Sequence, residues 1–245
     1  MTAAHAQHPS QYTADDHTTW ATLVRQRLTT LSHTAAVEVL TGIDAIGLSH
    51  ERVPLLRELN ARLAPRTGWQ VVPVSGYLNP REFFSFLADR RFPSTTHIRP
   101  REQLAYIPSP DIFHDVFGHV PLHADPTFAE MLQQFGLLGT RAMSESAMVA
   151  VQRLFWFTVE FGLVGTTDHP RLYGSGLVSS MAEERHALGG GCRLQPFDLD
   201  RVLQQSFAVD AVQPTLFVLP GFRALRDAVG HLGAQLPSAE LPMIS

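Results

Sequence analysis

The chain has 245 residues, of which 44% are hydrophobic and 17% charged, and its formal net charge is −4 at pH 7. This composition is typical of a soluble globular protein with one sizeable core, so we expect one domain. The slightly acidic balance offers no basic stripe for phosphates, which argues against a nucleic-acid partner. The sequence has no apolar run of about 18 residues for a membrane span and no signal peptide, so we expect a cytoplasmic protein. Its single cysteine, Cys192, excludes a disulfide framework and a thiolate metal site.

The first quarter of the chain is expected to be helical behind a short tail. Residues 1–15 are polar and lack periodicity, which predicts a disordered tail before a domain over residues 16–245. Apolar residues then recur at helical spacing over residues 18–63. We expect the last helix of this run to end before Pro65, because proline interrupts the helical hydrogen bonds.

A strand and a further helix are expected next. The stretch at residues 68–77 is short and rich in β-branched side chains, which predicts a strand. Asn79 followed by Pro80 is a typical helix start, because the asparagine side chain caps the helix and proline suits its first position. We therefore expect a helix over residues 79–90.

Two helices and one or two strands are expected in the remainder. Ser109 can cap a helix of about ten residues that ends before Pro121. Residues 153–165 are mostly apolar and predict a buried helix. Residues 206–222 alternate enough to predict one or two short strands. The expected fold class is therefore mainly α with a few short β-strands.

Residues 110–128 contain three histidines and three aspartates among apolar side chains, which indicates a site that is both buried and polar. His114 and His119 are five residues apart, so a continuous α-helix would place them about 140° apart around its axis. They could share a metal only where the helix unravels, and Gly118 followed by Pro121 favours that position. The spacing also differs from that of zinc peptidases, whose two histidines are four apart with Glu after the first.

Glu160 completes a candidate metal centre. It is the one charge in an apolar run of about ten residues, and a buried carboxylate needs a compensating cation or metal. Two imidazoles and one carboxylate form the facial triad that usually holds non-haem Fe(II) and leaves positions open for O₂ and substrates. On spacing alone, two histidines near a helix end are more often a structural or surface pair than metal ligands.

Two other classes of function remain open from the residues. A zinc-dependent hydrolase could use the same three ligands to activate water, with Asp115 or a nearby carboxylate as its base. A non-catalytic binding protein would keep the pocket and the metal without turnover. The hydrolase would be fully active without a redox cofactor or O₂.

Three separated segments carry a family resemblance. They are "PDIFHDVFGHVPLHADPTFAEM" from Pro110, "FWFTVEFGL" from Phe155 and "YGSGLVSS" from Tyr173. In this order they resemble the pterin-dependent aromatic amino acid hydroxylases, most closely the short bacterial phenylalanine hydroxylases, over about residues 68–222. The resemblance implies a single catalytic domain of the aromatic amino acid hydroxylase type. It also implies Fe(II), tetrahydrobiopterin or a related tetrahydropterin, O₂ as co-substrate and an Fe(IV)=O intermediate.

The resemblance also assigns roles to individual residues. It implies that the iron ligands and the catalytic centre are His114, His119 and Glu160. The cofactor-binding residues that it implies are Gly76, Leu78, Phe83, Asp115 and Phe155. The substrate-binding residues that it implies are Arg99, Pro108, Asp111, Trp156, Phe161, Gly176, Ser179 and Val209.

Several of these assignments have a chemical basis in the family pattern. Arg99 would hold the carboxylate of the amino acid, since a guanidinium is its natural bidentate partner, and Asp111 would orient Arg99. Ser179 would hydrogen-bond an iron-ligating histidine and fix its ring. Phe83 would stack on the pterin. Without the resemblance, Arg99 would be read as solvated, Ser179 as a helix cap and Phe83 as part of the core.

The implied substrate is L-phenylalanine, converted to L-tyrosine. Trp156 resembles the phenylalanine and tyrosine enzymes, and Val209 stands where tyrosine enzymes have Asp. Phe161 and Gly176 match the enzymes that hydroxylate the para carbon. A tryptophan hydroxylase or a phenylalanine 3-hydroxylase of the same family is the alternative.

Some positions depart from the family pattern. Phe155 stands where relatives commonly have Tyr, and Asp115 replaces the Glu of animal enzymes. His123 stands in place of an apolar residue and is four residues from His119, but Pro121 would break the helix that such a metal pair needs. We therefore expect His123 in the second sphere or on the surface. The sequence also lacks the regulatory domain and assembly helix of animal members, so we expect a monomer.

Overall fold

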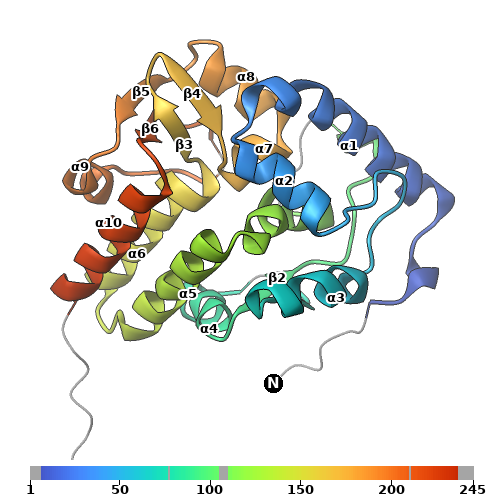
Figure 1. Cartoon of the computed structure of the whole chain (residues 1–245), viewed down its shortest axis with the longest axis horizontal. Coiled ribbons are helices and arrows are strands. Elements are labelled where there is room, and N and C mark those ends of the chain that lie inside the picture. The colour runs from blue at the N-terminus through green and yellow to red at the C-terminus, as the bar shows by residue number, and fades with distance from the viewer. Residues whose placement is uncertain (1–6, 77, 105–109, 210, 237–245) are drawn as a thin grey trace, which may run out of the picture.

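The structure is a computed structural model that describes residues 7–76, 78–104, 110–209 and 211–236 (Figure 1). The α-helices are α1 (Ala14–Thr34), α2 (Val37–Ala45), α3 (Leu56–Thr67), α4 (Pro80–Ala88), α5 (Pro126–Arg141), α6 (Glu145–Phe155), α7 (Ser175–Ser179), α8 (Met181–Leu188), α9 (Leu199–Gln204) and α10 (Phe222–Gln235). The strands are β1 (Gln70–Pro73), β2 (Arg91–Ser94), β3 (Leu163–Thr166), β4 (His169–Leu172), β5 (Arg193–Pro196) and β6 (Thr215–Leu219). Two π-helices are η3 (Phe113–His119) and η5 (Trp156–Glu160), and the 3-10 helices are η1 (Pro9–Gln11), η2 (Arg101–Gln103) and η4 (Val120–Ala124). The expected fold class, mainly α with a few short strands, is confirmed.

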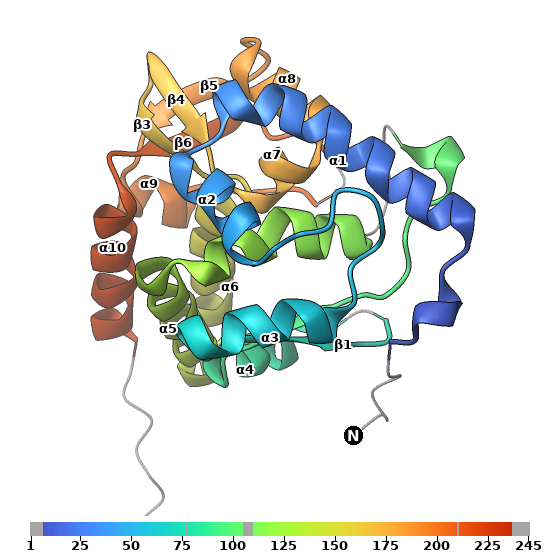
Figure 2. The ribbon, with the colours of Figure 1, turned by 45° about the vertical axis from the view of Figure 1, so that its right-hand side comes forward.

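The strands form two small sheets at opposite sides of the helices. β1 and β2 pair in parallel beside α3 and α4, and the four-stranded sheet has the order β4-β3-β6-β5. In that sheet β3 pairs antiparallel with β4 and parallel with β6. Figures 1 and 2 show the four-stranded sheet at the top with α8, and α3 and α4 at the bottom, next to α5.

Two glycines allow α4 and α5 to pack closely in the core. A Cβ on Gly136 would lie 2.0 Å from the backbone nitrogen of Ala88, and one on Gly139 would lie 2.3 Å from Cβ of Phe84. Both glycines lie in α5, whose buried face includes Phe128 and Phe135. α4 begins at the Asn79 cap as expected, because the asparagine side chain accepts from the backbone of the third helical residue. α5 thus supports α4, whose residues Pro80, Phe83 and Phe84 line the cavity described below.

The disordered tail expected over residues 1–15 does not hold for residues 7–15. The Tyr12 hydroxyl donates to the carbonyl of Thr96 at 2.7 Å, and Thr13 caps α1. The bond to Thr96 joins residues 84 positions apart, so local periodicity cannot predict it, whereas the Thr13 cap is a local contact with Asp16. The rest of that tail lies outside the described residues.

Two helix boundaries also differ from expectation. Pro65 does not end α3, which continues to Thr67. Pro65 lies in the last turn, so it removes only one backbone donor from the helix. Gly68, with φ +75°, ends it in the left-handed conformation that glycine favours. The helix expected over residues 153–165 ends at Glu160 and gives way to β3, because a short apolar run suits a buried strand as well as a buried helix.

Candidate metal centre and adjoining cavity

The two histidines share one side of a π-helix. In η3 the backbone winds with i→i+5 geometry, so residues five apart lie about one turn apart on the same side. This places His114 and His119 next to each other, with ring centroids 5.0 Å apart. We expected the helix to unravel at Gly118. The structure shows a widened helix there, followed by the 3-10 helix η4 that contains Pro121.

Glu160 approaches the same point from a second π-helix. It is the last residue of η5, and its Oε1 lies 3.1 Å from Nε2 of His119. Its Oε2 lies 3.7 Å from Nε2 of His114. One ligand atom from each of these three residues lies within 4.8 Å of the other two. The two π-helices therefore bring together two nitrogens and one carboxylate on a single point.

The electrostatics of this cluster fit a divalent transition metal. Burial lowers the pKa of His114 to about 4, so its imidazole is neutral at pH 7. Burial alone would raise the pKa of Glu160, but His119, His114 and the Ser175 hydroxyl outweigh that effect and lower it to about 2. A neutral imidazole and an ionised carboxylate are the forms that bind metal. The donor set thus matches the facial triad of non-haem Fe(II) sites.

α7 supplies one hydroxyl to each of two candidate ligands. Ser179 Oγ lies 2.9 Å from Nδ1 of His114, and Ser175 Oγ donates to Oε2 of Glu160 at 2.7 Å. Gly118 allows this approach, because a Cβ there would lie 2.9 Å from the carbonyl oxygen of Ser175 and 3.3 Å from Cβ of Ser179. Ser179 was singled out in the sequence, whereas Ser175 was missed because a serine at a helix start resembles a cap.

Arg99 and Asp111 form a buried pair beside the cluster. Nε and Nη2 of Arg99 donate to the two carboxylate oxygens of Asp111, each at 2.8 Å. Asp111 also accepts from the backbone nitrogens of Arg99 and of His114, at 2.9 and 3.0 Å. Burial raises the pKa of Asp111, but its bonds from Arg99 and His114 outweigh this and lower it. The pair fixes one edge of the guanidinium, so its Nη1 atom is not engaged by Asp111.

His123 is buried and lies behind the cluster. Its side chain is 1% exposed, so it is not a surface residue, and its Nδ1 lies 2.9 Å from the carbonyl oxygen of His119. Its ring packs at right angles against Trp69 and at 72° to Phe92, with centroids 4.7 and 5.0 Å away. Burial lowers its pKa to about 3. It therefore contacts the backbone of a candidate ligand and belongs to the second sphere.

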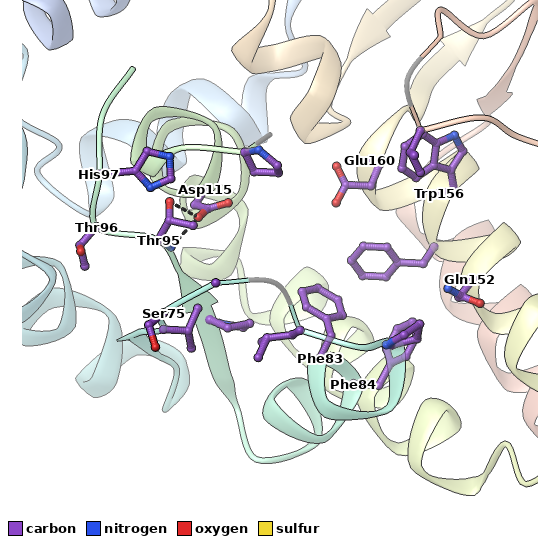
Figure 3. A pocket seen from close by; sticks show the side chains of 18 of the residues that line it. Ser75, Phe83, Phe84, Thr95, Thr96, His97, Asp115, Gln152, Trp156 and Glu160 are labelled. Carbon is purple, nitrogen blue, oxygen red and sulfur yellow. Dashed lines mark hydrogen bonds between the residues drawn. The ribbon is translucent and has the colours of Figure 1, made fainter. Parts of the chain in front are cut away.

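A cavity of about 770 Å³ opens next to the cluster. Figure 3 shows Glu160 and Trp156 on one wall, Thr95, Asp115 and His97 on the opposite wall, and Phe83 and Phe84 below them in this view. The sequence-predicted residues that line it are Gly76, Leu78, Phe83, Asp115, Phe155, Trp156, Glu160 and Val209.

Asp115 is held at the polar wall of the cavity. Its Oδ2 accepts from the backbone nitrogen of Thr95 at 2.7 Å and from the Thr95 hydroxyl at 2.9 Å. Burial raises the pKa of Asp115 to about 7. Gly76, which also lines the cavity, has φ +84°, in the left-handed region. This wall offers polar atoms to a ligand, whereas the facing wall is mainly aromatic.

The aromatic wall contains one member that sequence reasoning missed. Phe207 stacks on Trp156 with centroids 4.6 Å apart, and Phe161 lies 4.8 Å from Trp156 on a tilted plane. Phe207 lies in the stretch over residues 206–222 that we expected to contain one or two strands, but among its described residues the structure has a strand only at β6 and an irregular backbone at Phe207. The alternation therefore did not indicate its role. Gly176 leaves room for Phe161, since a Cβ there would lie 2.9 Å from its ring. Val209 lies at the rim with 76% of its surface exposed.

The remaining sequence-predicted residues lie around the cluster or cannot be placed. Those that support the cluster or the aromatic wall without lining the cavity are Arg99, Asp111, Phe161, Gly176 and Ser179. Pro108, expected in the substrate pocket, and Ser109, expected as a helix cap, lie outside the described residues. None of the described helices is long and apolar enough to cross a membrane.

A family model, related sequences and a solved structure all relate this chain to the same group of proteins. The model of a family described as biopterin-dependent aromatic amino acid hydroxylase matches residues 5–239. The phenylalanine-4-hydroxylases of Ralstonia nicotianae and Chromobacterium violaceum are 42% and 40% identical over 89% of this chain, and the matches cover 70% and 74% of those proteins. A crystal structure of the Chromobacterium violaceum enzyme with iron(III) and 7,8-dihydrobiopterin superposes with a TM-score of 0.89 at 39% identity, covering 97% of this chain and 87% of that one.

Proposed function

This chain belongs to the biopterin-dependent aromatic amino acid hydroxylases, and we propose that it converts L-phenylalanine to L-tyrosine with Fe(II), a tetrahydropterin and O₂. The observation that carries the proposal is the convergence of His114, His119 and Glu160 beside a cavity walled by aromatic rings. Such a centre binds Fe(II) with open positions that face a space large enough for a cofactor and an amino acid.

The proposed roles of the protein's residues are to bind, to orient and to exclude water. Bound Fe(II) and the tetrahydropterin together supply the redox chemistry that activates O₂. Holding the reactants in register lowers the entropic part of the barrier. The cavity wall formed by Trp156 and Phe207, with Phe161 behind Trp156, favours an aromatic ring over water. Ring hydroxylation requires no protein acid or base, so we assign none.

Arg99 is the proposed partner of the amino acid's carboxylate. Asp111 holds its Nε and Nη2, which fixes the guanidinium plane and leaves Nη1 free of this pair. Oδ1 of Asp111 accepts from both Nη2 of Arg99 and the backbone nitrogen of His114, so Arg99 lies close to the candidate metal centre. A carboxylate bound there would position the aromatic ring of the substrate on the side of the metal.

The tetrahydropterin is proposed to occupy the part of the cavity between Phe83 and Asp115. Phe83 contacts Phe155 at a centroid distance of 5.4 Å, and both rings line the cavity. Gly76 and Leu78 would supply backbone contacts, and Asp115, held by Thr95, would face the polar edge of the ring system.

Product analysis tests this function. Protein loaded with Fe(II) is mixed with tetrahydrobiopterin, O₂ and equal amounts of phenylalanine, tyrosine and tryptophan. The products are separated by chromatography and identified by mass spectrometry. We expect tyrosine from phenylalanine, and none when iron or pterin is omitted. Meta-tyrosine or 5-hydroxytryptophan would contradict the proposed substrate pocket. Hydrolytic turnover without pterin or O₂ would contradict the reaction class.

Three further expectations are part of the proposal. We propose that residues 16–245 act as one catalytic domain, which is supported by a buried apolar cluster shared by α1, α5 and β6. We propose that the protein acts as a monomer in the cytoplasm without a nucleic-acid partner, the last supported by its net charge of −4. Light scattering of the iron-loaded protein tests the monomer, and a molar mass of twice 27.1 kDa would contradict it.

A further inference from the structure

Arg27 is a buried cation whose partners lie far along the chain. It lies in the middle of α1 and is only 1% exposed, although arginine is seldom fully buried. Nε donates to the carbonyl of Val178 at 2.7 Å, and Nη2 donates to the carbonyl of Leu177 at 3.1 Å. Nη1 donates to Oε2 of Glu184 at 2.5 Å. One guanidinium thus joins α1 to α7 and α8.

The charge of Arg27 is compensated by Glu184, which is itself held by further hydrogen bonds. Glu184 accepts from the hydroxyls of Thr30 and Thr34, at 2.8 and 2.7 Å, in addition to its bond with Arg27. All these donors lie on α1, and Glu184 is itself buried. A buried ion pair is tolerated when its remaining donors and acceptors are satisfied in this way.

α7 depends on Arg27 for its own hydrogen bonding. It has five residues, and the last four carbonyls of any helix have no partner within that helix. Arg27 supplies donors to the carbonyls of Leu177 and Val178, both within that last turn. Figures 1 and 2 show α1 beside α7, and the bonds from Arg27 join these two helices. The position of α7 is therefore fixed from α1.

Two serines of the same short helix form hydrogen bonds with two of the candidate metal ligands. Ser175 at its start binds Glu160, and Ser179 at its end lies against His114. Leu177 and Val178, the residues that Arg27 holds, lie between these two serines. A displacement of α7 would move both hydroxyls at once, and the close contact at Gly118 leaves little room for it.

We propose that Arg27 is a positioning residue of the metal centre. By holding the carbonyls of α7, it sets the positions of Ser175 and Ser179 and, through them, the orientation of the His114 ring and the Glu160 carboxylate. The inference rests on the proposed function in one respect, that this centre binds a divalent metal. Residues that orient metal ligands in this way commonly change metal affinity by about 10- to 100-fold when they are removed.

The test is Co(II) binding to the metal-free protein, followed by the visible absorption of the bound ion. The main variant is Arg27→Met/Glu184→Met, which removes both charges together and so avoids a lone buried charge. We expect it to fold, to bind Co(II) about 10- to 100-fold more weakly and to show an altered absorption spectrum. Glu184→Gln keeps the bonds from Arg27 to α7, and we expect it to stay within about threefold of the parent affinity.

A control variant separates positioning from general stability. Leu232→Ala opens a cavity under α10, so it should lower the melting temperature without changing the Co(II) affinity or spectrum. If Leu232→Ala weakened Co(II) binding as much as the double variant, metal affinity would follow stability and the inference would be overturned.

A mutant cycle tests the route through Ser179. The cycle compares Co(II) affinity in the Arg27→Met/Glu184→Met variant, in Ser179→Ala and in the protein that carries all three changes. If Arg27 acts through α7, the loss of affinity in the combined variant will be smaller than the product of the two separate losses. Independent, multiplicative losses would overturn the route. A folded double variant with parent affinity and spectrum would overturn the inference alone. A parent protein that binds neither Co(II) nor Fe(II) would overturn the proposed function and the inference with it.

Discussion

Ser179 Oγ lies 2.9 Å from Nδ1 of His114, while Nε2 of the same ring faces Oε2 of Glu160 at 3.7 Å. A neutral His114 that donates Nδ1–H to Ser179 presents an unprotonated Nε2 to a metal. We therefore expect Ser179→Ala to lower the affinity for Fe(II) or Co(II) by about 10- to 100-fold. Titration of the metal-free protein measures this. Ser180→Ala, which removes the cap of α8, should lower stability and leave the metal affinity unchanged.

His123 is close to the centre without being placed as a ligand. Replacement of His114, His119 or Glu160 by Ala should abolish stoichiometric iron binding, whereas His123→Ala should still bind one iron per chain. Because His123 fills a buried site against Trp69, its loss should cost about 1–3 kcal/mol of unfolding free energy. Elemental analysis and urea unfolding give the two quantities. Iron loss in folded His123→Ala would show that the ligand set is different.

Arg99→Ala should chiefly weaken binding of the amino acid. Loss of a charge-assisted bond to the substrate carboxylate should raise the apparent KM for phenylalanine by about 10- to 100-fold. The matched control is Arg101→Ala, which removes an exposed cation two residues away and should leave KM unchanged. Steady-state kinetics at saturating pterin measure both. An unchanged KM in Arg99→Ala would remove Arg99 from the substrate site.

Gly176 is predicted to control where the ring is hydroxylated. A Cβ at this position would lie 2.9 Å from the ring of Phe161, so Gly176→Ala should push that ring toward the substrate. We expect a lower kcat and a larger share of meta-tyrosine among the products. Chromatography with authentic standards measures the product ratio. A parent-like ratio and rate would mean that Phe161 moves elsewhere and does not set ring depth.

Glu184 predicts a pH dependence of stability. Burial alone would raise its pKa, but hydrogen bonds from Thr34, Arg27 and Thr30 outweigh burial and lower it below 4.5. Its contribution is therefore present above pH 4.5 and is lost as the pH falls through the lowered value. Glu184→Gln should be less stable than the parent by about 1–3 kcal/mol at pH 7 and by less at pH 3. Urea unfolding at the two pH values tests this, and a difference that is constant with pH would contradict it.

The sequence singled out the three residues that the structure brings together, but not the backbone that joins them. The residue types at His114, His119 and Glu160 are readable, because a charge in an apolar run and paired imidazoles are unusual. The π-helices were not predictable, because hydrophobic periodicity detects a period of 3.6 or 2 and a local widening leaves no comparable signal. The sequence therefore led to an unravelled helix where the structure has η3.

Long-range partners explain the other omissions. Arg27 looks like a polar residue on one face of α1, and only the fold shows that its acceptors are Val178 and Glu184. The strands β2 to β5 have four residues each, too few for an alternating pattern. β3 and β4 form a local hairpin, whereas the pairing of β6 with β3 and β5 joins segments farther apart in the chain. Ser175 and Phe207 were missed for the same reason, since their roles depend on what faces them.

The extra residue in each turn of η3 has a consequence for how this centre can vary. Between His114 and His119, amino-acid replacement keeps the count of residues and with it the shared side of the two rings. A one-residue deletion there would leave the two histidines four apart, a spacing that an α-helix also places on one face, but it would change where Gly118 stands relative to them, and Gly118 is where α7 approaches closely. Outside Gly118, whose contact with α7 leaves no room for a side chain, this segment should therefore tolerate volume-conserving substitutions better than changes in its length.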